Sequence, residues 1–206
     1  IIEHEGELWK RYGFTDFLFI IGHMGNQISS YFGDGSKWGV PIDYYQETLP
    51  LGTAGALGYL KEQLTEDFFV FYGDTIVDFD MEAMLKYHQE KKAVATLFLH
   101  PNDHPYDSDI VELDAEGKVV KFHNKPHPEG FVSKNIVNAA LFIFSPEILG
   151  QIEVGVKSHI EKNVLPRCLE TDMPLYGYVS FEYIKDMGTP ERYEAVCKDV
   201  ECRKVA

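Results

Sequence analysis

The sequence predicts an α/β fold in which helices cover a mixed, mainly parallel sheet. Over residues 1–99, short apolar runs typical of strands alternate with segments of helical period, and the connections between them are short. Repeated strand–helix–strand units of this kind favour parallel strands with helices on their faces. Past Pro101, two short apolar runs flank the turn sequence DAEG at residues 114–117, which predicts a hairpin and therefore some antiparallel strands.

Each element depends on a local signal in the sequence. Gly13 and the Gly33-Asp34-Gly35 turn end the first two helices, and Ser145-Pro146-Glu147 begins a later one. Helices are expected at residues 2–12, 26–32, 54–64, 81–91, from 145 onward, 159–169 and 189–200. Strands are expected at residues 17–21, 42–46, 68–72, 93–99, 110–113, 119–122, 136–144 and 175–181. Because runs 17–21 and 68–72 are apolar throughout, these two strands are predicted to be buried on both faces.

Composition excludes several classes of protein. The 206 residues are 45% apolar, which is enough for the core of a single domain spanning residues 1–206. The formal charge of −14 leaves no cationic excess for binding a nucleic-acid backbone. The longest apolar runs are too short to cross a bilayer, and no signal sequence is visible. Three cysteines without a CxxC pair favour a reducing, cytoplasmic location.

Two carboxylates follow strand-like segments and are candidates for a metal site. Asp74 comes directly after the apolar run 68–72 and the small residue Gly73, and Asp186 follows residues 183–185. Ligands of open α/β sheets bind beyond the carboxyl ends of the strands, so the two side chains are candidates to converge there on Mg²⁺ and substrate phosphates. The alternative is that each Asp caps a helix or forms a turn.

Two loops and one short motif offer further candidates. The small residues of LGTAGA at 51–56 would let a base or phosphate approach backbone N–H groups, although an ordinary tight loop has the same composition. Lys125, before Pro126, is a candidate phosphate-binding charge, the alternative being a solvated surface lysine. Asp78 and Asp80 form a DxD pattern, but Asp80 fits a helix N-cap better than a metal site.

Taken together, these segments resemble the sugar-1-phosphate nucleotidylyltransferase family. The matching motifs run in the family's order over nearly the whole chain: LGTAGAL at 51–57, FYGDT at 71–75, VNAALFIF at 137–144, IEKNVLP at 160–166 and DMGTPERY at 186–193. The chain looks most similar to the guanylyltransferases of mannose 1-phosphate and D-glycero-D-manno-heptose 1-phosphate. The stretch HPNDHPYDSD at 100–109 and KPHP at 125–128 favour the heptose members.

The resemblance implies a fold, a reaction and a set of roles. The fold would be a three-layer, Rossmann-like sheet of the nucleotide-diphospho-sugar transferase type. The reaction would join an NTP, with guanine the implied base, to a sugar 1-phosphate and release pyrophosphate. The implied Mg²⁺ ligands are Asp74 and Asp186, and the implied nucleotide-binding residues are Gln46, Gly52, Thr53, Gly55 and Gly73. Lys125 would hold the sugar phosphate, with Asn124 and Asn138 on the sugar.

The sequence departs from the family at two places. Asn124 stands where the family usually has Glu, which implies a changed sugar contact. The family begins with a strand and a GGxGTRL-type loop that holds the triphosphate, whereas this chain begins at about the following helix, so the domain is expected to be N-terminally incomplete and nearly inactive alone. Dimers are common in such enzymes, and some heptose members are fused to a phosphatase domain.

Two other functions remain open at this point. One is a binding or regulatory protein of the same fold without catalysis, and the other is a glycosyltransferase that uses Asp78 and Asp80 as its metal pair. The combination of Asp74, Lys125 and Asp186 favours the enzyme over the regulatory protein. The motifs LGTAGAL and DMGTP favour it over the glycosyltransferase.

Overall fold

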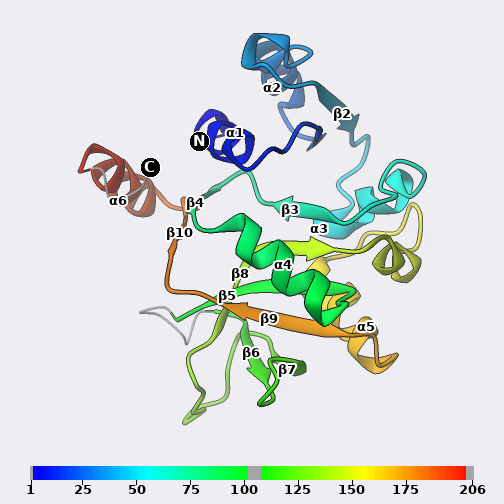
Figure 1. The fold of residues 1–206 in the computed structure, drawn as a ribbon, viewed down its shortest axis with the longest axis vertical. Coiled ribbons are helices and arrows are strands. Elements are labelled where there is room, and N and C mark those ends of the chain that lie inside the picture. Colours follow the sequence, from blue (N-terminus) through cyan, green and yellow to red (C-terminus); the bar gives the residue numbers. More distant parts are fainter. Residues whose placement is uncertain (1, 102–107, 203–206) are drawn as a thin grey trace.

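The computed structural model describes residues 2–101 and 108–202. Its strands form a central layer, and helices lie on both sides of that layer (Figure 1). The strands are β1 Phe17–Ile21, β2 Ile42–Gln46, β3 Phe68–Phe71, β4 Thr75–Asp78, β5 Ala95–His100, β6 Ile110–Leu113, β7 Val119–His123, β8 Val137–Phe144, β9 Leu175–Val179 and β10 Tyr183–Asp186. The helices are α1 Ile2–Arg11, α2 Gly25–Phe32, α3 Gly52–Gly55, α4 Met81–Lys91, α5 Leu165–Glu170 and α6 Pro190–Glu201. Shorter helical turns are η1 Ser36–Trp38, η2 Ala56–Leu60, η4 Pro146–Gln151 and the π-helical η5 Ile160–Val164.

The main sheet has the order β7-β6-β8-β5-β9, and β3 pairs with β8 as well. Strand β8 runs antiparallel to both β3 and β5, and β9 runs parallel to β5, so β3, β5 and β9 share one direction. The hairpin β6–β7 adds the expected antiparallel pair, and β1 and β2 form a separate parallel ladder. The predicted α/β class with a mixed sheet is confirmed, with parallel hydrogen-bonded ladders at β1–β2 and β5–β9 and the reversed β8 between β3 and β5.

Two apolar cores lie on opposite faces of this sheet, as the alternation of side chains along a strand requires. Phe142 and Phe144 of β8 belong to the first core, with η2, η4, η5 and α5. Leu141 and Ile143, the residues between and before them, belong to the second core, with α1 and α4. Helices therefore cover both faces, which is the three-layer arrangement.

Several predicted elements differ in detail from the structure. The helix expected at 54–64 is a single α turn, α3, followed by the 3₁₀ turn η2, and it ends at Leu60. Strand β4 was not predicted, and β10 was recognised only as the strand-like segment 183–185, because each is four residues long and, unlike the equally short β6, has no hairpin turn beside it. The prediction that β1 and β3 are buried on both faces is wrong: most of their side chains are half-buried, and Ile20 is 40% exposed. The reason is that, among the described residues, each of these strands has a ladder on one edge only.

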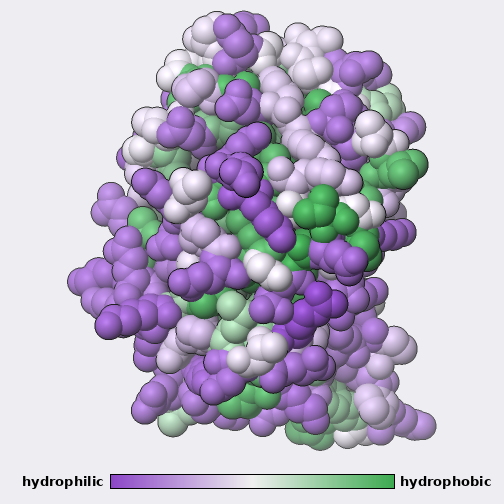
Figure 2. All heavy atoms as spheres, turned by 90° about the vertical axis from the view of Figure 1, so that its right-hand side faces the viewer, coloured by the Kyte–Doolittle hydropathy of each residue, from purple (hydrophilic) through white to green (hydrophobic). Residues whose placement is uncertain are grey.

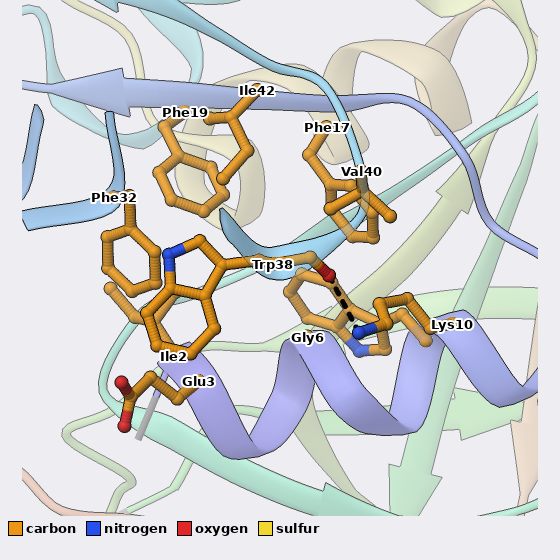
Figure 3. A pocket seen from close by; sticks show the side chains of 11 residues that line it. Ile2, Glu3, Gly6, Lys10, Phe17, Phe19, Phe32, Trp38, Val40 and Ile42 are labelled. Carbon is orange, nitrogen blue, oxygen red and sulfur yellow. Dashed lines mark hydrogen bonds between the residues drawn. The ribbon is translucent and has the colours of Figure 1, made fainter. Parts of the chain in front are cut away.

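Helix α1 joins the β1–β2 pair to the rest of the molecule through aromatic contacts. The ring of Trp9 lies 5.4 Å from that of Phe17 on β1 and 4.4 Å from that of Phe71 on β3, measured between centroids. Beside it, a small apolar pocket separates α1 from β1, β2 and η1, and the Lys10 ammonium closes one end by donating to the Trp38 carbonyl at 2.7 Å (Figure 3). The indole N–H groups of Trp9 and Trp38 are buried without a hydrogen-bond partner among the described residues.

The surface on the side of α3 and α5 is mainly hydrophilic, with apolar atoms gathered at mid-height (Figure 2). Leu49, Val154 and Val156 are exposed apolar side chains of the loops that flank α3. Within residues 2–101 and 108–202, the helices are all too short or too polar to cross a membrane.

Candidate active site

The carboxyl ends of β3, β5 and β9 meet the amino end of β8 along one edge of the main sheet. Leu99 of β5 lies opposite Asn138 of β8, and Phe71 of β3 lies opposite Leu141. The N–H of Ser180, directly after β9, donates to the carbonyl of Leu99 at 2.9 Å. The segments that follow β3 and β9 therefore begin at the edge where Asn138 lies, and they carry the two predicted carboxylates.

Asp74 and Asp186 are neighbours in the structure although 112 positions (186 − 74) separate them in the sequence. The short antiparallel ladder β4–β10 places Asp186 opposite Thr75. The N–H of Met187 donates to the Asp74 carbonyl at 2.8 Å, which joins the two segments one residue beyond the end of the ladder. Asp74 is exposed and Asp186 is half-buried, so both carboxylates are accessible from solvent.

The Asp186 carboxylate already has protein partners. Arg192 Nη1 donates to Oδ1 at 2.7 Å and to Oδ2 at 2.9 Å, and the Gly188 N–H donates to Oδ1 at 3.2 Å. The described part of the chain contains no group of three or more His, Cys, Asp or Glu side chains that could enclose a metal ion. An ion held by Asp74 and Asp186 would therefore complete its shell with oxygens from elsewhere, as Mg²⁺ does when it binds substrate phosphates and water.

The DxD motif serves the fold instead. The Asp80 carboxylate accepts from the Ala83 N–H at 2.9 Å and caps α4, as the sequence predicted. The Asp80 N–H donates in turn to Glu182 at 2.9 Å, which holds the β9–β10 loop against the start of the helix. This use of Asp80 removes the main support for the glycosyltransferase alternative.

The residues expected at the sugar phosphate are gathered by Asp109, for which sequence reasoning had no role at this site. The Asp109 carboxylate accepts from the Lys125 N–H at 3.0 Å, and its carbonyl accepts from the Asn138 N–H at 3.0 Å. Asn124 precedes Lys125 in the same loop and is exposed. Part of the stretch at 100–109 that favoured the heptose members, residues 102–107, lies outside the described residues.

A histidine–phenylalanine stack supports the loop that carries Lys125. The Phe131 ring lies 4.7 Å from that of His127 and 5.0 Å from that of His123. His127 Nε2 also lies 2.8 Å from the carbonyl of Ser108, the neighbour of Asp109. The loop is thus fixed on both sides of Lys125.

The glycines of the LGTAGA loop have a structural reason for being glycine. Gly52 has φ +76°, and a Cβ there would lie 2.4 Å from the Ser158 carbonyl oxygen. A Cβ on Gly55 would lie 2.8 Å from the Val156 carbonyl oxygen. The Ala54 N–H donates to Ser158, and the Ser158 N–H donates back to Leu51. Close contact with the 156–158 backbone therefore gives Gly52 and Gly55 a structural role, and their predicted role in nucleotide binding stays a prediction.

Thr53 and Tyr72 connect this loop to the end of β3. The Thr53 hydroxyl accepts from the Ile160 N–H at 3.0 Å, and the Tyr72 hydroxyl donates to the neighbouring Glu161 at 2.7 Å. Burial, with the Glu161 charge, raises the pKa of Tyr72 well above its ordinary value, so the hydroxyl stays protonated and keeps this bond. Glu161 had no predicted role, because it does not follow a strand-like segment and its partner is 89 residues away.

Gln46 and Gly73 are the other two predicted nucleotide-binding residues. Gln46 ends β2, and its amide donates to the carbonyls of Gly22 and Glu47 at 3.2 and 3.3 Å. The Glu47 carboxylate accepts from the Leu51 N–H, so Glu47 links Gln46 to the LGTAGA loop. Gly73 is exposed, and the nearest atom to a Cβ there is a methyl group of Ile2 at 3.9 Å.

Known proteins match both the sequence and the fold. A family model described as "Nucleotidyl transferase" matches residues 1–202. The chain is 34% identical over 164 residues to a mannose-1-phosphate guanylyltransferase of Mycobacterium tuberculosis, covering 79% of this chain and 45% of that protein. It is 29% identical over 211 residues to a UTP–glucose-1-phosphate uridylyltransferase of Synechocystis, covering 95% and 54%. The chain thus spans about half the length of the curated relatives it matches.

Solved structures share the same fold at lower identity. HddC from Yersinia pseudotuberculosis superposes with a TM-score of 0.79 at 20% identity, covering 97% of this chain and 83% of that one. A second structure of HddC, complexed with GMP-PN, gives 0.80 and covers 97% and 85%. Because the family model matches nearly the whole chain and the fold agrees, the chain belongs to the nucleotidyl transferase family.

Proposed function

We propose that this domain belongs to a sugar-1-phosphate nucleotidylyltransferase that uses GTP and a mannose- or heptose-type sugar 1-phosphate. The observation that supports this most is the adjacency of Asp74 and Asp186 at the same sheet edge as Asn138 and the Lys125 loop. Metal-binding carboxylates beside a phosphate-binding lysine are what a reaction between two phosphorylated substrates needs. Relatives named guanylyltransferases and uridylyltransferases carry out reactions of this class on mannose or glucose 1-phosphate.

The donor set at the edge fits Mg²⁺, because carboxylate oxygens are the ligands this ion prefers. Asp74 and Asp186 would hold the ion, which when bound would supply positive charge to the α-phosphoryl group and the departing pyrophosphate. For Asp186 to do so, Arg192 must share or release the carboxylate it now binds.

The remaining residues bind and align the substrates. A phosphate oxygen of the sugar 1-phosphate attacks the α-phosphorus, the bond to the bridging oxygen breaks, and pyrophosphate leaves with that electron pair. The attacking phosphate is already anionic, so no general base is needed. Lys125 would hold this phosphate, and Asn138 and Asn124 would orient the sugar. Asp109 accepts the backbone N–H groups of Lys125 and Asn138 and so fixes these two residues relative to each other.

The test is pyrophosphate release by the full-length protein with Mg²⁺, GTP and either mannose 1-phosphate or D-glycero-D-manno-heptose 1-phosphate. Asp74→Asn and Asp186→Asn should each lower the rate by about 10²-fold or more, because the charge stabilising the transition state is lost. Asp172→Asn is the matched control: this exposed carboxylate precedes β9, at the opposite edge of the sheet, and pairs with Lys118. Unchanged rates in the first two variants would exclude the metal assignment.

The choice of base and sugar is tested in the same assay. GTP should give the highest kcat/KM among GTP, UTP and dTTP. A preference for UTP or dTTP would replace guanine in this proposal while leaving the reaction class intact.

We also propose that the triphosphate is held by a strand-and-loop segment that is not among these residues. Strands β1 and β3 each have one edge with no ladder in the described structure, which supports a strand position between them. A GGxGTRL-type loop following such a strand would reach the carboxyl edge where Asp74 lies. The 206 residues alone should therefore turn over very slowly.

A further inference from the structure

Arg192 is the cation that the fold places on the proposed metal ligand. It lies in the first turn of α6, three residues after the N-cap Thr189, whose hydroxyl accepts the Arg192 N–H. Its Nη1 donates to both oxygens of Asp186, at 2.7 and 2.9 Å. The only other lysine or arginine in the segment 183–193, Lys185, is bound to Asp199 at 2.6 Å. Arg192 is therefore the positive charge of this segment that faces Asp186.

The helix that carries Arg192 is also anchored at its far end. Asp199 is buried in α6, 7% exposed, and accepts from the Tyr183 hydroxyl at 3.0 Å and from Lys185. Both partners belong to β10, the strand that ends in Asp186. With α6 held to β10 at both ends, the Arg192–Asp186 pair is part of a defined geometry and not a chance surface contact.

A guanidinium and a divalent ion compete for the same carboxylate. Each oxygen of Asp186 has about two lone-pair positions; both oxygens accept from Arg192, and Oδ1 also accepts from the Gly188 N–H. Direct metal binding needs at least one of these positions, and the guanidinium charge repels an incoming cation. Substrate phosphates can remove this conflict, because they offer the guanidinium a new anionic partner.

We propose that Arg192 is a latch on Asp186: it weakens the binding of a bare metal ion several-fold, and it releases Asp186 when the ion arrives with phosphates. This inference rests on the proposed function, because it takes Asp186 as a metal ligand. Arg192 is a positioning residue in this account: it acts on the metal through Asp186, and it need not touch the reacting atoms.

The test is binding of Mn²⁺ alone to the full-length protein, followed by electron paramagnetic resonance and independent of turnover. Arg192→Gln should bind Mn²⁺ about two- to fivefold more tightly than the natural chain, the range expected for loss of a half-exposed ion pair. Lys198→Gln is the matched control, because it removes one positive charge from an exposed position of the same helix, and it should leave the affinity unchanged. The Mn²⁺ affinity of Arg192→Lys should fall between those of the natural chain and Arg192→Gln, because a lysine keeps the charge but not the geometry of the guanidinium.

Asp186→Asn, alone and combined with Arg192→Gln, separates the two hypotheses. If Asp186→Asn leaves Mn²⁺ affinity unchanged when Arg192 has been replaced by Gln, Asp186 is not a ligand and the proposed metal site itself fails. If Asp186→Asn weakens binding but Arg192→Gln does not tighten it, only the latch is excluded. Equal tightening by Arg192→Gln with and without Asp186 would also exclude the latch, because the effect would then be one of net charge. Absence of binding in both the natural chain and Arg192→Gln would contradict it too.

Discussion

At the scale of single residues, the proposed sugar-phosphate site depends on Asp109. Its carboxylate and its carbonyl accept the backbone N–H groups of Lys125 and Asn138, so one residue fixes the spacing of two binding groups. Asp109 precedes β6, whereas Lys125 follows β7, so the hairpin between them closes a ring around this contact.

Replacing Asp109 by Ala should weaken the binding of sugar 1-phosphate selectively. Loss of the acceptor for the Lys125 N–H should raise the KM for this substrate about fivefold, as expected for one partly exposed hydrogen bond. The KM for the nucleotide should not change. Asp109→Asn keeps an oxygen acceptor, so its KM for sugar 1-phosphate should be close to that of the natural protein. Steady-state kinetics of the full-length protein measures the KM for each substrate in both variants. Equal changes in the KM for sugar 1-phosphate and the KM for the nucleotide would contradict the positioning role.

Sequence patterns identified the two candidate metal ligands but not the residues that hold the candidate site together. Asp74 and Asp186 stood out because each is a carboxylate after a strand-like segment, and the structure brings them together. Asp109, Glu161 and Arg192 had no such signal, because each acts through a partner that folding brings to it: the Lys125 loop, Tyr72 directly after β3 and Asp186 on β10. The nucleotide-binding role of Gly52 and Gly55 stays a prediction; the structure adds that both lie against the 156–158 backbone, a neighbour that sequence spacing does not reveal.

At the scale of elements, strands and helices with a clear period were predictable and short ones were not. The runs Phe17–Ile21, Ile42–Gln46 and Met81–Lys91 match the structure end to end. Strands β4 and β10 are too short to show alternation, and each gains its identity from the other. That ladder positions both candidate metal ligands, so the least predictable pair of strands is central to the proposed site.

His88 is a buried contact between two elements, α4 and β5. It is 1% exposed, its Nδ1 lies 2.8 Å from the Thr96 hydroxyl on β5, and its Nε2 lies 3.7 Å from the Asp67 carboxylate. Burial lowers the pKa of His88 below its ordinary value, and the attraction of Asp67 offsets this only in part. The folded protein therefore holds His88 neutral.

This burial predicts a loss of stability in acid. Because the unfolded chain binds the proton more tightly than the folded one, the free energy of unfolding should fall as pH drops below about 6.5, by at most about 1.4 kcal/mol per pH unit for this group. Above that pH the contribution is constant. His88→Asn should flatten the dependence between pH 7.5 and 5, whereas the control His23→Asn, at an exposed position, should not. Urea unfolding at several pH values measures this, and identical slopes for His88→Asn and the natural chain would refute it.

At the scale of the whole molecule, the sheet is continuous in its packing but interrupted in its hydrogen bonding. Phe17 of β1 packs against the second core, as Phe69 and Phe71 of β3 do. Leu18 packs against the first core, as Phe68 and Val70 do. Both strands thus extend the same two layers, yet no ladder joins β1 to β3 among the described residues. Trp9 of α1 contacts both strands, through Phe17 of β1 and Phe71 of β3.

This geometry predicts that an added strand will stabilise the domain. A designed β-strand with a GGxGTRL-type loop, joined to the amino end of α1, should pair with the edges of β1 and β3 that carry no ladder among the described residues. The added strand should also bury apolar surface on both faces of the sheet. The Tm measured by calorimetry should rise by about 5 °C or more, since about 1 kcal/mol corresponds to 2–4 °C at this size. The fluorescence of a dye that binds exposed apolar surface should fall. A matched variant with Pro at the centre of the added strand cannot complete the ladder and should show neither change. If both versions raised Tm equally, the gain would come from the added length and not from a strand between β1 and β3.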